Sequence, residues 1–282
     1  MMNSFKGKET SVCTQKNIVI PKQPKGKGSS VCTEKKKIVI PNNQNEKLVG
    51  LLHDTGSKEI VVLCHGFNSN KDNQILKMVS TALEKEAISS FRFDFSGYGE
   101  SEGSFNYGNY KYEAEDLHSV IQHFSNTNRV VTTILGHSRG GDVVILYASK
   151  YPVRNVINIS GRFDLKKGIR LGEGYLEKIK EQGFIDATEG KSEFRVTEES
   201  LMERLNTDMQ QACLKIGKEC KVLTIHGSGD VVVPVEDAKE FAKVVPNHKL
   251  EIVEGANHGY SKHQRPLLSI VMEFIKSSIA KN

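Results

Sequence analysis

The pentapeptide Gly-His-Ser-Arg-Gly occupies residues 136–140 and directly follows the apolar run 130–135. Residues 141–150 have a helical pattern, so the pentapeptide lies between a predicted strand and a predicted helix. In so tight a turn, a side chain in place of Gly136 or Gly140 would collide with the neighbouring strand or helix. This context predicts a nucleophile elbow with Ser138 as the nucleophile.

An acid and a base follow in the order that such a serine requires. Residues 221–226 form a predicted strand that leads into a loop ending on Asp230, and the loop after the predicted strand 249–253 carries His258. Serine, then acid, then histidine is the chain order of α/β-hydrolase triads. Each candidate follows the carboxyl end of a strand, where open α/β sheets place their sites. Asp237 is the weaker candidate for the acid because it falls within the next predicted helix.

Attack of a serine on a carbonyl group creates an oxyanion, which needs two aimed N–H donors. We expect one from the backbone of Arg139, because the N–H groups of a first helical turn are free. We expect the other from Phe67, because Gly66 lets the loop after the third strand approach the serine. Three other histidines near strand ends are expected to serve other purposes: His65, His137 and His226.

Strand patterns recur along the chain and alternate with helical ones, which predicts an α/β fold with one eight-stranded, mostly parallel, doubly wound sheet. Continuous apolar runs such as 60–64 are typical of strands that are buried on both faces. The predicted strands are 37–41, 47–53, 59–65, 88–95, 130–136, 154–160, 220–226 and 248–254. The predicted helices between them are 71–86, 111–125, 139–150, 235–245 and 263–279.

Residues 161–215 interrupt this alternation with far more chain than one connection needs. Their pattern predicts a helix over 172–182, a hairpin around 189–192, and a helix over 198–215 that is capped by Thr197. Loops at the carboxyl ends of the strands lie next to the serine. We therefore expect a small cap over the site, with a simple stabilising subdomain as the alternative.

The N-terminal segment contains a near-repeat, because residues 11–21 are echoed by 30–41. We expect the second copy to fill an edge-strand position, and residues 1–36 to form a disordered basic extension of a hydrolase domain at 37–282. Ten lysines and three glutamates lie in residues 1–47, so the net charge of +5 originates in this segment. A solvated extension explains this charge; a phosphorylated or sulfated partner is the alternative.

Composition narrows the class of protein and its compartment further. The five cysteines contain no Cys-x-x-Cys pair, and no apolar stretch is long enough to cross a membrane or to act as a secretion signal, which favours a reduced, cytoplasmic protein. No spacing is typical of metal ligands, and the glycine-rich run 94–101 reads as a structural turn with Tyr98 near the pocket mouth. No cofactor, metal, nucleic acid or stable membrane insertion is expected.

With these residues in place, the chain resembles the α/β-hydrolase superfamily over residues 37–282. Four motifs together resemble the serine aminopeptidase S33-type branch: His-Gly-Phe at 65–67, Asp-x-x-Gly-x-Gly-x-Ser at 94–101, the pentapeptide, and Asp-x-x-Val-Pro at 230–234. Residues 160–164 and the small cap resemble feruloyl (cinnamoyl) esterases. The resemblance implies a carboxylic ester substrate and an acyl-enzyme on Ser138. Because the chain has no tryptophan, a phenolic ester would pack against Phe67, Phe163, Tyr175, Phe184 or Phe194.

The expected activity is therefore hydrolysis of esters with small to medium acyl or aryl groups. Alternatives are a lipid or acylglycerol hydrolase, an aminopeptidase, and a ligand sensor that keeps a slow triad. Ser138 argues against epoxide hydrolases and haloalkane dehalogenases, which resemble this fold but use an aspartate at that position. The oligomeric state stays open.

Overall fold

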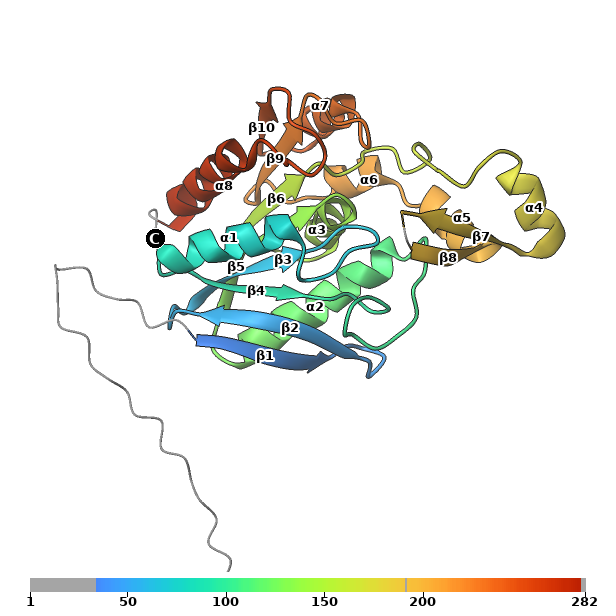
Figure 1. Cartoon of the computed structure of the whole chain (residues 1–282). Helices are drawn as coiled ribbons and strands as arrows, with labels where there is room; N and C mark the ends of the chain where they lie inside the picture. The colour runs from blue at the N-terminus through green and yellow to red at the C-terminus, as the bar shows by residue number, and fades with distance from the viewer. Residues whose placement is uncertain (1–33, 191, 280–282) are drawn as a thin grey trace, which may run out of the picture. The chain divides into compact units, whose positions relative to one another are not determined.

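The computed structural model describes residues 34–190 and 192–279 (Figure 1). Eight strands form one sheet in the order β1-β2-β4-β3-β5-β6-β9-β10. Strand β2 runs antiparallel to the other seven, which all point the same way. The predicted α/β-hydrolase fold with a mostly parallel sheet is thus confirmed. Across the sheet the strands are β1 (Glu34–Pro41), β2 (Lys47–Asp54), β4 (Ser89–Phe93), β3 (Glu59–Cys64), β5 (Val130–His137), β6 (Asn155–Ile159), β9 (Lys221–Gly227) and β10 (His248–Val253).

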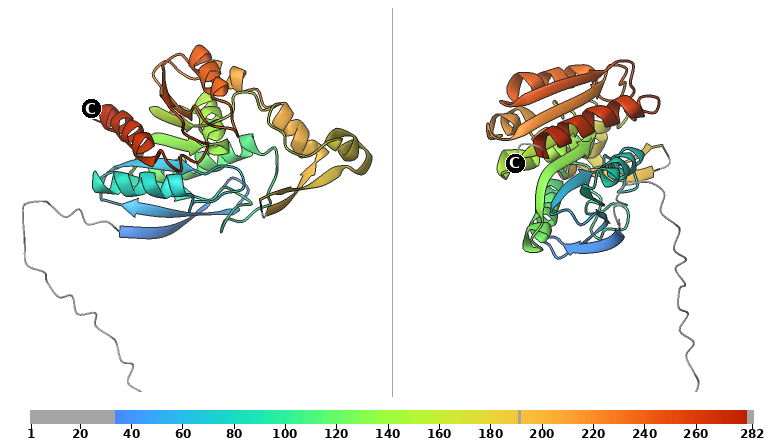
Figure 2. Two further views of the ribbon diagram at one scale, coloured as in Figure 1. Left: turned by 45° about the horizontal axis from the view of Figure 1, so that its top comes forward. Right: turned by 90° about the vertical axis from the view of Figure 1, so that its left-hand side faces the viewer.

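Helices cover both faces of the sheet (Figure 2). The apolar sides of α1 (Gln74–Lys85) and α8 (Gln264–Ile279) pack in one core with Val61 and Leu63 of β3. A second core lies on the other face and contains apolar residues of α2 (Tyr110–Asn126), α3 (Arg139–Lys150) and α7 (Val235–Val244). Every residue of β6 and all but the first residue of β3 are buried, as expected of strands that lie inside the sheet and not at its edges.

The insertion after β6 has its own helices and strands, and its last helix packs against the main core. Its elements are α4 (Tyr175–Gln182), β7 (Phe184–Glu189), β8 (Ser192–Thr197), α5 (Glu198–Leu205) and α6 (Met209–Leu214). Strands β7 and β8 pair as the predicted hairpin. Figure 1 shows α4, β7, β8 and α5 grouped on the side toward which β3 and β4 point.

Two details of the insertion differ from the prediction. The single helix expected over 198–215 is wrong, because α5 ends at Leu205 and Asp208 caps a new helix by accepting a hydrogen bond from the Gln211 N–H. Helix α4 begins at Tyr175 and not at 172, since Gly174 takes the left-handed conformation. The predicted cap of α5 is confirmed: Thr197 accepts from the Ser200 N–H, and Ser200 bonds back.

The second copy of the N-terminal repeat supplies β1, which is an edge strand as expected. It pairs with β2 from Glu34 opposite Asp54 to Pro41 opposite Lys47. The consecutive residues Lys35, Lys36 and Lys37 place charge on this open edge, which discourages pairing with other chains. The first copy lies outside the described residues.

Candidate active site

Ser138 lies at the junction of β5 and α3 with a left-handed backbone, φ 56° and ψ −123°. A non-glycine residue is strained in this conformation, and such strain is common at functional sites. A Cβ on Gly136 would lie 1.9 Å from the Gly140 carbonyl oxygen, and one on Gly140 would lie 2.5 Å from the carbonyl oxygen of Cys64. The predicted collisions are therefore confirmed, and both glycines are required by the turn.

Asp230 and His258 meet as predicted. Nδ1 of His258 lies 2.7 Å from Oδ2 of Asp230. A carboxylate only accepts hydrogen bonds, so we assign the ring proton to Nδ1, which leaves Nε2 unprotonated. Ser138 and His258 line the same cavity. The half-buried Ser138 and the unprotonated ring nitrogen of His258 thus border the same cavity, as general-base activation requires.

Asp230 is held in its charged form. Burial alone would raise the pKa of this carboxyl, but hydrogen bonds from His226, from His258 and from the Val233 N–H lower it below its usual value. Nε2 of His226 lies 3.4 Å from Oδ2 and donates to the Val233 carbonyl oxygen at 2.9 Å. The alternative acid, Asp237, instead lies 3.7 Å from a guanidinium nitrogen of Arg162.

His137 has a role that the sequence prediction missed. Its Nε2 donates to the backbone carbonyl oxygen of His258 at 2.9 Å. Burial lowers the pKa of His137 to about 4, so the ring is neutral at physiological pH. Because the two residues are 121 positions apart in the chain, no local pattern could have indicated this bond.

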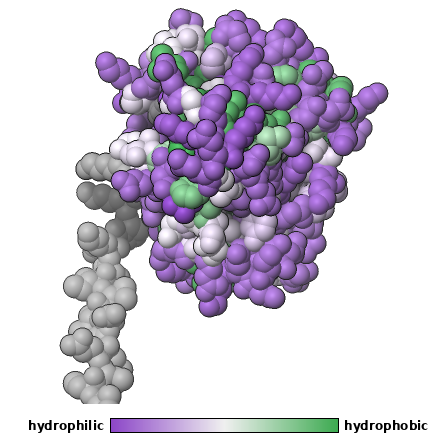
Figure 3. Space-filling model, turned by 90° about the vertical axis from the view of Figure 1, so that its right-hand side faces the viewer, coloured by the Kyte–Doolittle hydropathy of each residue, from purple (hydrophilic) through white to green (hydrophobic). Residues whose placement is uncertain are grey.

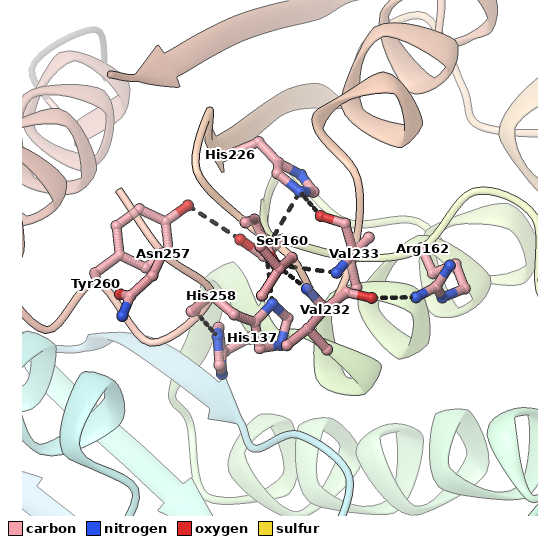
Figure 4. A network of polar contacts seen from close by, with 12 residues as sticks. His137, Ser160, Arg162, His226, Val232, Val233, Asn257, His258 and Tyr260 are labelled. Carbon is pink, nitrogen blue, oxygen red and sulfur yellow. Dashed lines mark hydrogen bonds and ion pairs between the residues drawn. The ribbon is translucent and has the colours of Figure 1, made fainter. Parts of the chain in front are cut away.

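Arg162 links the start of α3 to the loop that carries the acid, and Figure 4 shows its bond to Val232 of that loop. Its backbone N–H donates to Oδ1 of Asp142 at 2.6 Å, and its guanidinium donates to the Val232 carbonyl oxygen at 2.6 Å. The Val232 N–H in turn donates to Oδ1 of Asp230 at 2.8 Å. The position of the acid is therefore fixed from the elbow side as well as from its own strand.

The predicted oxyanion donors belong to the elbow itself, for Arg139, and to the loop after β3, for Phe67. A Cβ placed on Gly66 would lie 3.1 Å from the Cβ of Ser138, so the loop carrying Phe67 approaches the elbow closely. His65 holds this loop by donating from Nδ1 to the Gly66 carbonyl oxygen at 2.8 Å. Within residues 34–190 and 192–279, the backbone N–H groups of Phe67 and Arg139 have no acceptor. Both groups are available to a bound oxygen.

The side chain of Arg139 is buried behind the elbow. Its Nε donates to Oε2 of Glu113 at 2.8 Å, and one terminal nitrogen donates to the Tyr107 carbonyl oxygen at 2.8 Å. The guanidinium also lies 4.2 Å from the ring centre of Tyr110. This ion pair anchors the residue whose N–H is a predicted oxyanion donor, and no local pattern in the sequence indicates the pair.

A cavity of about 440 Å³ lies between the sheet end and the insertion. Of the aromatic residues expected to contact a phenolic group, Phe67 and Phe194 line it, together with Tyr107 and Tyr110. Phe163 instead packs on Phe241, and Phe184 lies under Arg195. The expectation for Tyr98 was wrong: its ring is buried against His65 and Phe105, and it does not reach the mouth.

Two further properties concern the described part of the chain. No group of three or more histidine, cysteine, aspartate or glutamate side chains there has the geometry to hold a metal ion. None of its helices combines the length and the apolar character needed to cross a membrane.

Comparison with known proteins places the chain among hydrolases. A family model described as serine aminopeptidase, S33, matches residues 55–211. Lipase 1 of Psychrobacter immobilis is 23% identical over 248 residues, which cover 76% of this chain and 75% of the lipase. At this identity the relationship is distant.

Solved structures share the architecture. Est1E from Butyrivibrio proteoclasticus, with ferulic acid bound, superposes with a TM-score of 0.76 at 23% identity and covers 86% of this chain and 99% of its own. The esterase Pf2001 of Pyrococcus furiosus superposes with a TM-score of 0.67 at 23% identity, covering 91% of this chain and 96% of its own. These likenesses establish a common fold.

Proposed function

Because the chain belongs to the serine aminopeptidase S33 family, we propose that it is a carboxylic ester hydrolase for small to medium acyl or aryl esters. The observation that carries the proposal is the 2.7 Å contact between Nδ1 of His258 and Oδ2 of Asp230, beside the strained elbow of Ser138. That contact leaves the other ring nitrogen of His258 as the base. We assign Ser138 as the nucleophile and Asp230 as the group that orients and charge-stabilises the imidazole.

In the proposed reaction, Nε2 of His258 takes the proton of the Ser138 hydroxyl as the serine oxygen attacks the ester carbonyl carbon. The negative charge moves to the carbonyl oxygen, which accepts hydrogen bonds from the N–H groups of Phe67 and Arg139. Collapse of this intermediate breaks the bond to the alcohol oxygen, and His258 returns the proton to the leaving alcohol. Water, deprotonated by His258, then attacks the acyl-enzyme and releases the carboxylic acid and free Ser138.

The dimensions and the walls of the cavity support the proposed substrate class. A volume of about 440 Å³ is at the lower end of small-molecule sites. Phe67 and Phe194 line the cavity and offer apolar surface to an acyl chain or an aryl group. The names of the structural neighbours agree with this choice, because Est1E was solved with ferulic acid and Pf2001 is an esterase.

Lipid hydrolysis is the second candidate, because one relative is a lipase. Figure 3 shows the face that carries the insertion as mostly hydrophilic, with smaller apolar areas between the hydrophilic side chains. Large apolar side chains exposed on the insertion include Leu176 and Met202. A face of this kind offers little area to a lipid surface, so we place lipid esters second.

A hydrolysis panel tests the proposal and ranks these candidates. Acetate, butyrate and palmitate p-nitrophenyl esters and methyl ferulate are assayed, with Ser138→Ala as the blank. We expect turnover of the short and aryl esters, and a loss of several orders of magnitude in Ser138→Ala. A loss below about tenfold would overturn the assignment of Ser138. A burst with p-nitrophenyl acetate that then stalls would instead indicate a ligand sensor.

A further inference from the structure

The cavity beside Ser138 contains an excess of positively charged side chains. Four arginines line it, whereas its acidic lining residues are Asp142 and Glu189. The four are Arg139, Arg162, Arg170 and Arg204. A neutral ester gives no reason for so many guanidinium groups, and only some of the four have a counter-charge within the protein.

Two of the four arginines are paired with carboxylates away from the cavity. Arg139 is bonded to Glu113 at 2.8 Å. Arg162 lies 3.7 Å from Asp237. Their charges are therefore offset within the protein, and they leave little attraction for a ligand.

Arg204 is different. Its side chain is buried, and its Nε and one terminal nitrogen donate to the carbonyl oxygens of Leu165 and Lys167 at 3.0 and 3.1 Å. Among the residues that the structure describes, no carboxylate forms an ion pair with it, and its remaining terminal nitrogen has no acceptor. That nitrogen is also accessible to solvent. A buried cation without a counter-ion is costly, and a bound anion would offset that cost.

Arg170 adds a second cation at the rim. It is exposed, its guanidinium donates to the Val231 carbonyl oxygen at 3.3 Å, and in the described part of the chain it has no carboxylate partner. Asp142 does not balance these charges fully, because burial raises the pKa of its carboxyl well above the usual value and favours the neutral acid. The lining thus presents more positive than negative charge.

We infer that the site takes esters whose acyl group carries a carboxylate, and that Arg204 binds this carboxylate while Arg170 guides it in at the rim. The inference rests on the proposed ester hydrolysis and names its substrate class. Guanidinium–carboxylate bonds are charge-assisted and stronger than neutral ones. Phe67 and Phe194 would contact the apolar part of the acyl chain between the ester and the carboxylate.

The test compares esters that differ in one group. Mono-p-nitrophenyl adipate and suberate end in a carboxylate, whereas p-nitrophenyl 6-methylheptanoate and 8-methylnonanoate carry an isopropyl group of the same shape. Initial rates at neutral pH, corrected for hydrolysis without enzyme, give kcat/KM for each ester. We expect the charged ester of at least one chain length to exceed its neutral counterpart by about tenfold or more. High salt should reduce this ratio by screening.

Variants locate the effect. Arg204→Gln should lower the ratio of charged to neutral ester turnover by about tenfold, and Arg204→Lys should retain part of it. Because Arg204 also holds two backbone carbonyls, Arg170→Gln gives an independent test at an exposed position, with an expected decrease of about threefold. Arg195→Gln is the matched control, since Arg195 is exposed, paired with Asp186 and outside the cavity lining.

The outcomes separate this inference from the proposed function. Faster or equal turnover of the neutral ester at both chain lengths would overturn the carboxylate preference and leave ester hydrolysis standing. A ratio unchanged in both Arg204→Gln and Arg170→Gln would likewise overturn the assignment to these residues. Absence of turnover for every ester would overturn both proposals together.

Discussion

His137 donates from Nε2 to the backbone carbonyl oxygen of His258 at 2.9 Å, and the two imidazole rings lie 4.9 Å apart. This bond joins the elbow after β5 to the loop after β10. The placement of the proposed base relative to Ser138 is therefore set by a direct contact and not only by the length of its own loop. His137 is a positioning residue, because it acts on the backbone of His258 and not on substrate.

Replacing His137 with alanine should lower kcat for p-nitrophenyl acetate by about tenfold, because the loss of one hydrogen bond lets the His258 loop move. KM should change by less than about threefold, since the cavity walls stay in place. His123→Ala is the control, as His123 lies on α2 outside the cavity lining. Equal kcat values for His137→Ala and the wild type would contradict the positioning role.

Asp230→Asn and Asp237→Asn together identify the acid. An asparagine at 230 can donate to Nδ1 of His258, which favours the ring tautomer with the proton on Nε2 and so removes the base. We expect kcat to fall by about 10⁴-fold for Asp230→Asn. For Asp237→Asn, kcat should stay within a few fold of the wild-type value, because Asp237 pairs with Arg162 and not with His258. Comparable losses in the two variants would refute the assignment.

Much of this arrangement is predictable from the sequence because its signals are local. Buried strands are continuous apolar runs, and the elbow needs glycines two positions on either side of Ser138. The carboxyl ends of β5, β9 and β10 bring the serine, the acid and the histidine to one edge of the sheet. Asp230 and His258 lie within bonding distance for that reason.

The remainder depends on contacts between distant segments. The bond from His137 to His258, the Arg139–Glu113 ion pair and the cation of Arg204 in the cavity wall require the fold before they can be recognised. The break between α5 and α6 depends on Asp208 acting as a cap, which competes with continuing the helix. Sequence patterns do not report which of these two outcomes tertiary packing selects.

Gly140→Ala tests the steric argument for the elbow. The added Cβ would lie 2.5 Å from the carbonyl oxygens of Cys64 and His65, and backbone atoms there cannot rotate away. We expect a loss of roughly 2–3 kcal/mol in the free energy of unfolding, measured in urea. A Cβ on Gly217 would meet no atom within 4 Å, so Gly217→Ala should change stability by less than about 0.5 kcal/mol. Similar stabilities of the two variants would count against this reading.

The stability of the protein should depend on pH through His65. Burial lowers the pKa of this histidine from its ordinary 6.5 to about 4. Between pH 4 and pH 6.5 the unfolded chain binds a proton that the folded chain does not. The contribution of His65 to the free energy of unfolding is therefore complete above pH 6.5 and is lost as the pH falls toward 4. The loss is about 1.4 kcal/mol for each pH unit.

Urea unfolding of the wild type and His65→Gln at several pH values isolates this effect, because the other titrating groups are common to both proteins. The free energy of unfolding of the wild type should fall more steeply with decreasing pH over this interval. Parallel pH profiles would show that His65 does not titrate differently on folding.

The buried ion pair of Arg139 and Glu113 allows a test of how the oxyanion side of the site is held. Both side chains are nearly inaccessible, with 3% and 1% exposed. Glu113→Gln keeps the shape of the side chain but leaves the guanidinium without a counter-charge. We expect a loss of about 3 kcal/mol or more in the free energy of unfolding. The double variant Arg139→Met, Glu113→Leu removes both charges and should regain much of that loss.

The exposed pair Lys243–Glu240 is the control, because Glu240→Gln should cost less than about 1 kcal/mol. Measuring kcat distinguishes a stabilising role of the Arg139–Glu113 pair from a role in positioning the Arg139 backbone. If the ion pair fixes the backbone of Arg139, the double variant should fold yet show a lower kcat with p-nitrophenyl acetate, since the N–H of Arg139 would be less well aimed at the oxyanion. Full activity in a folded double variant would mean that the helix start alone fixes that N–H, and that the pair serves stability only.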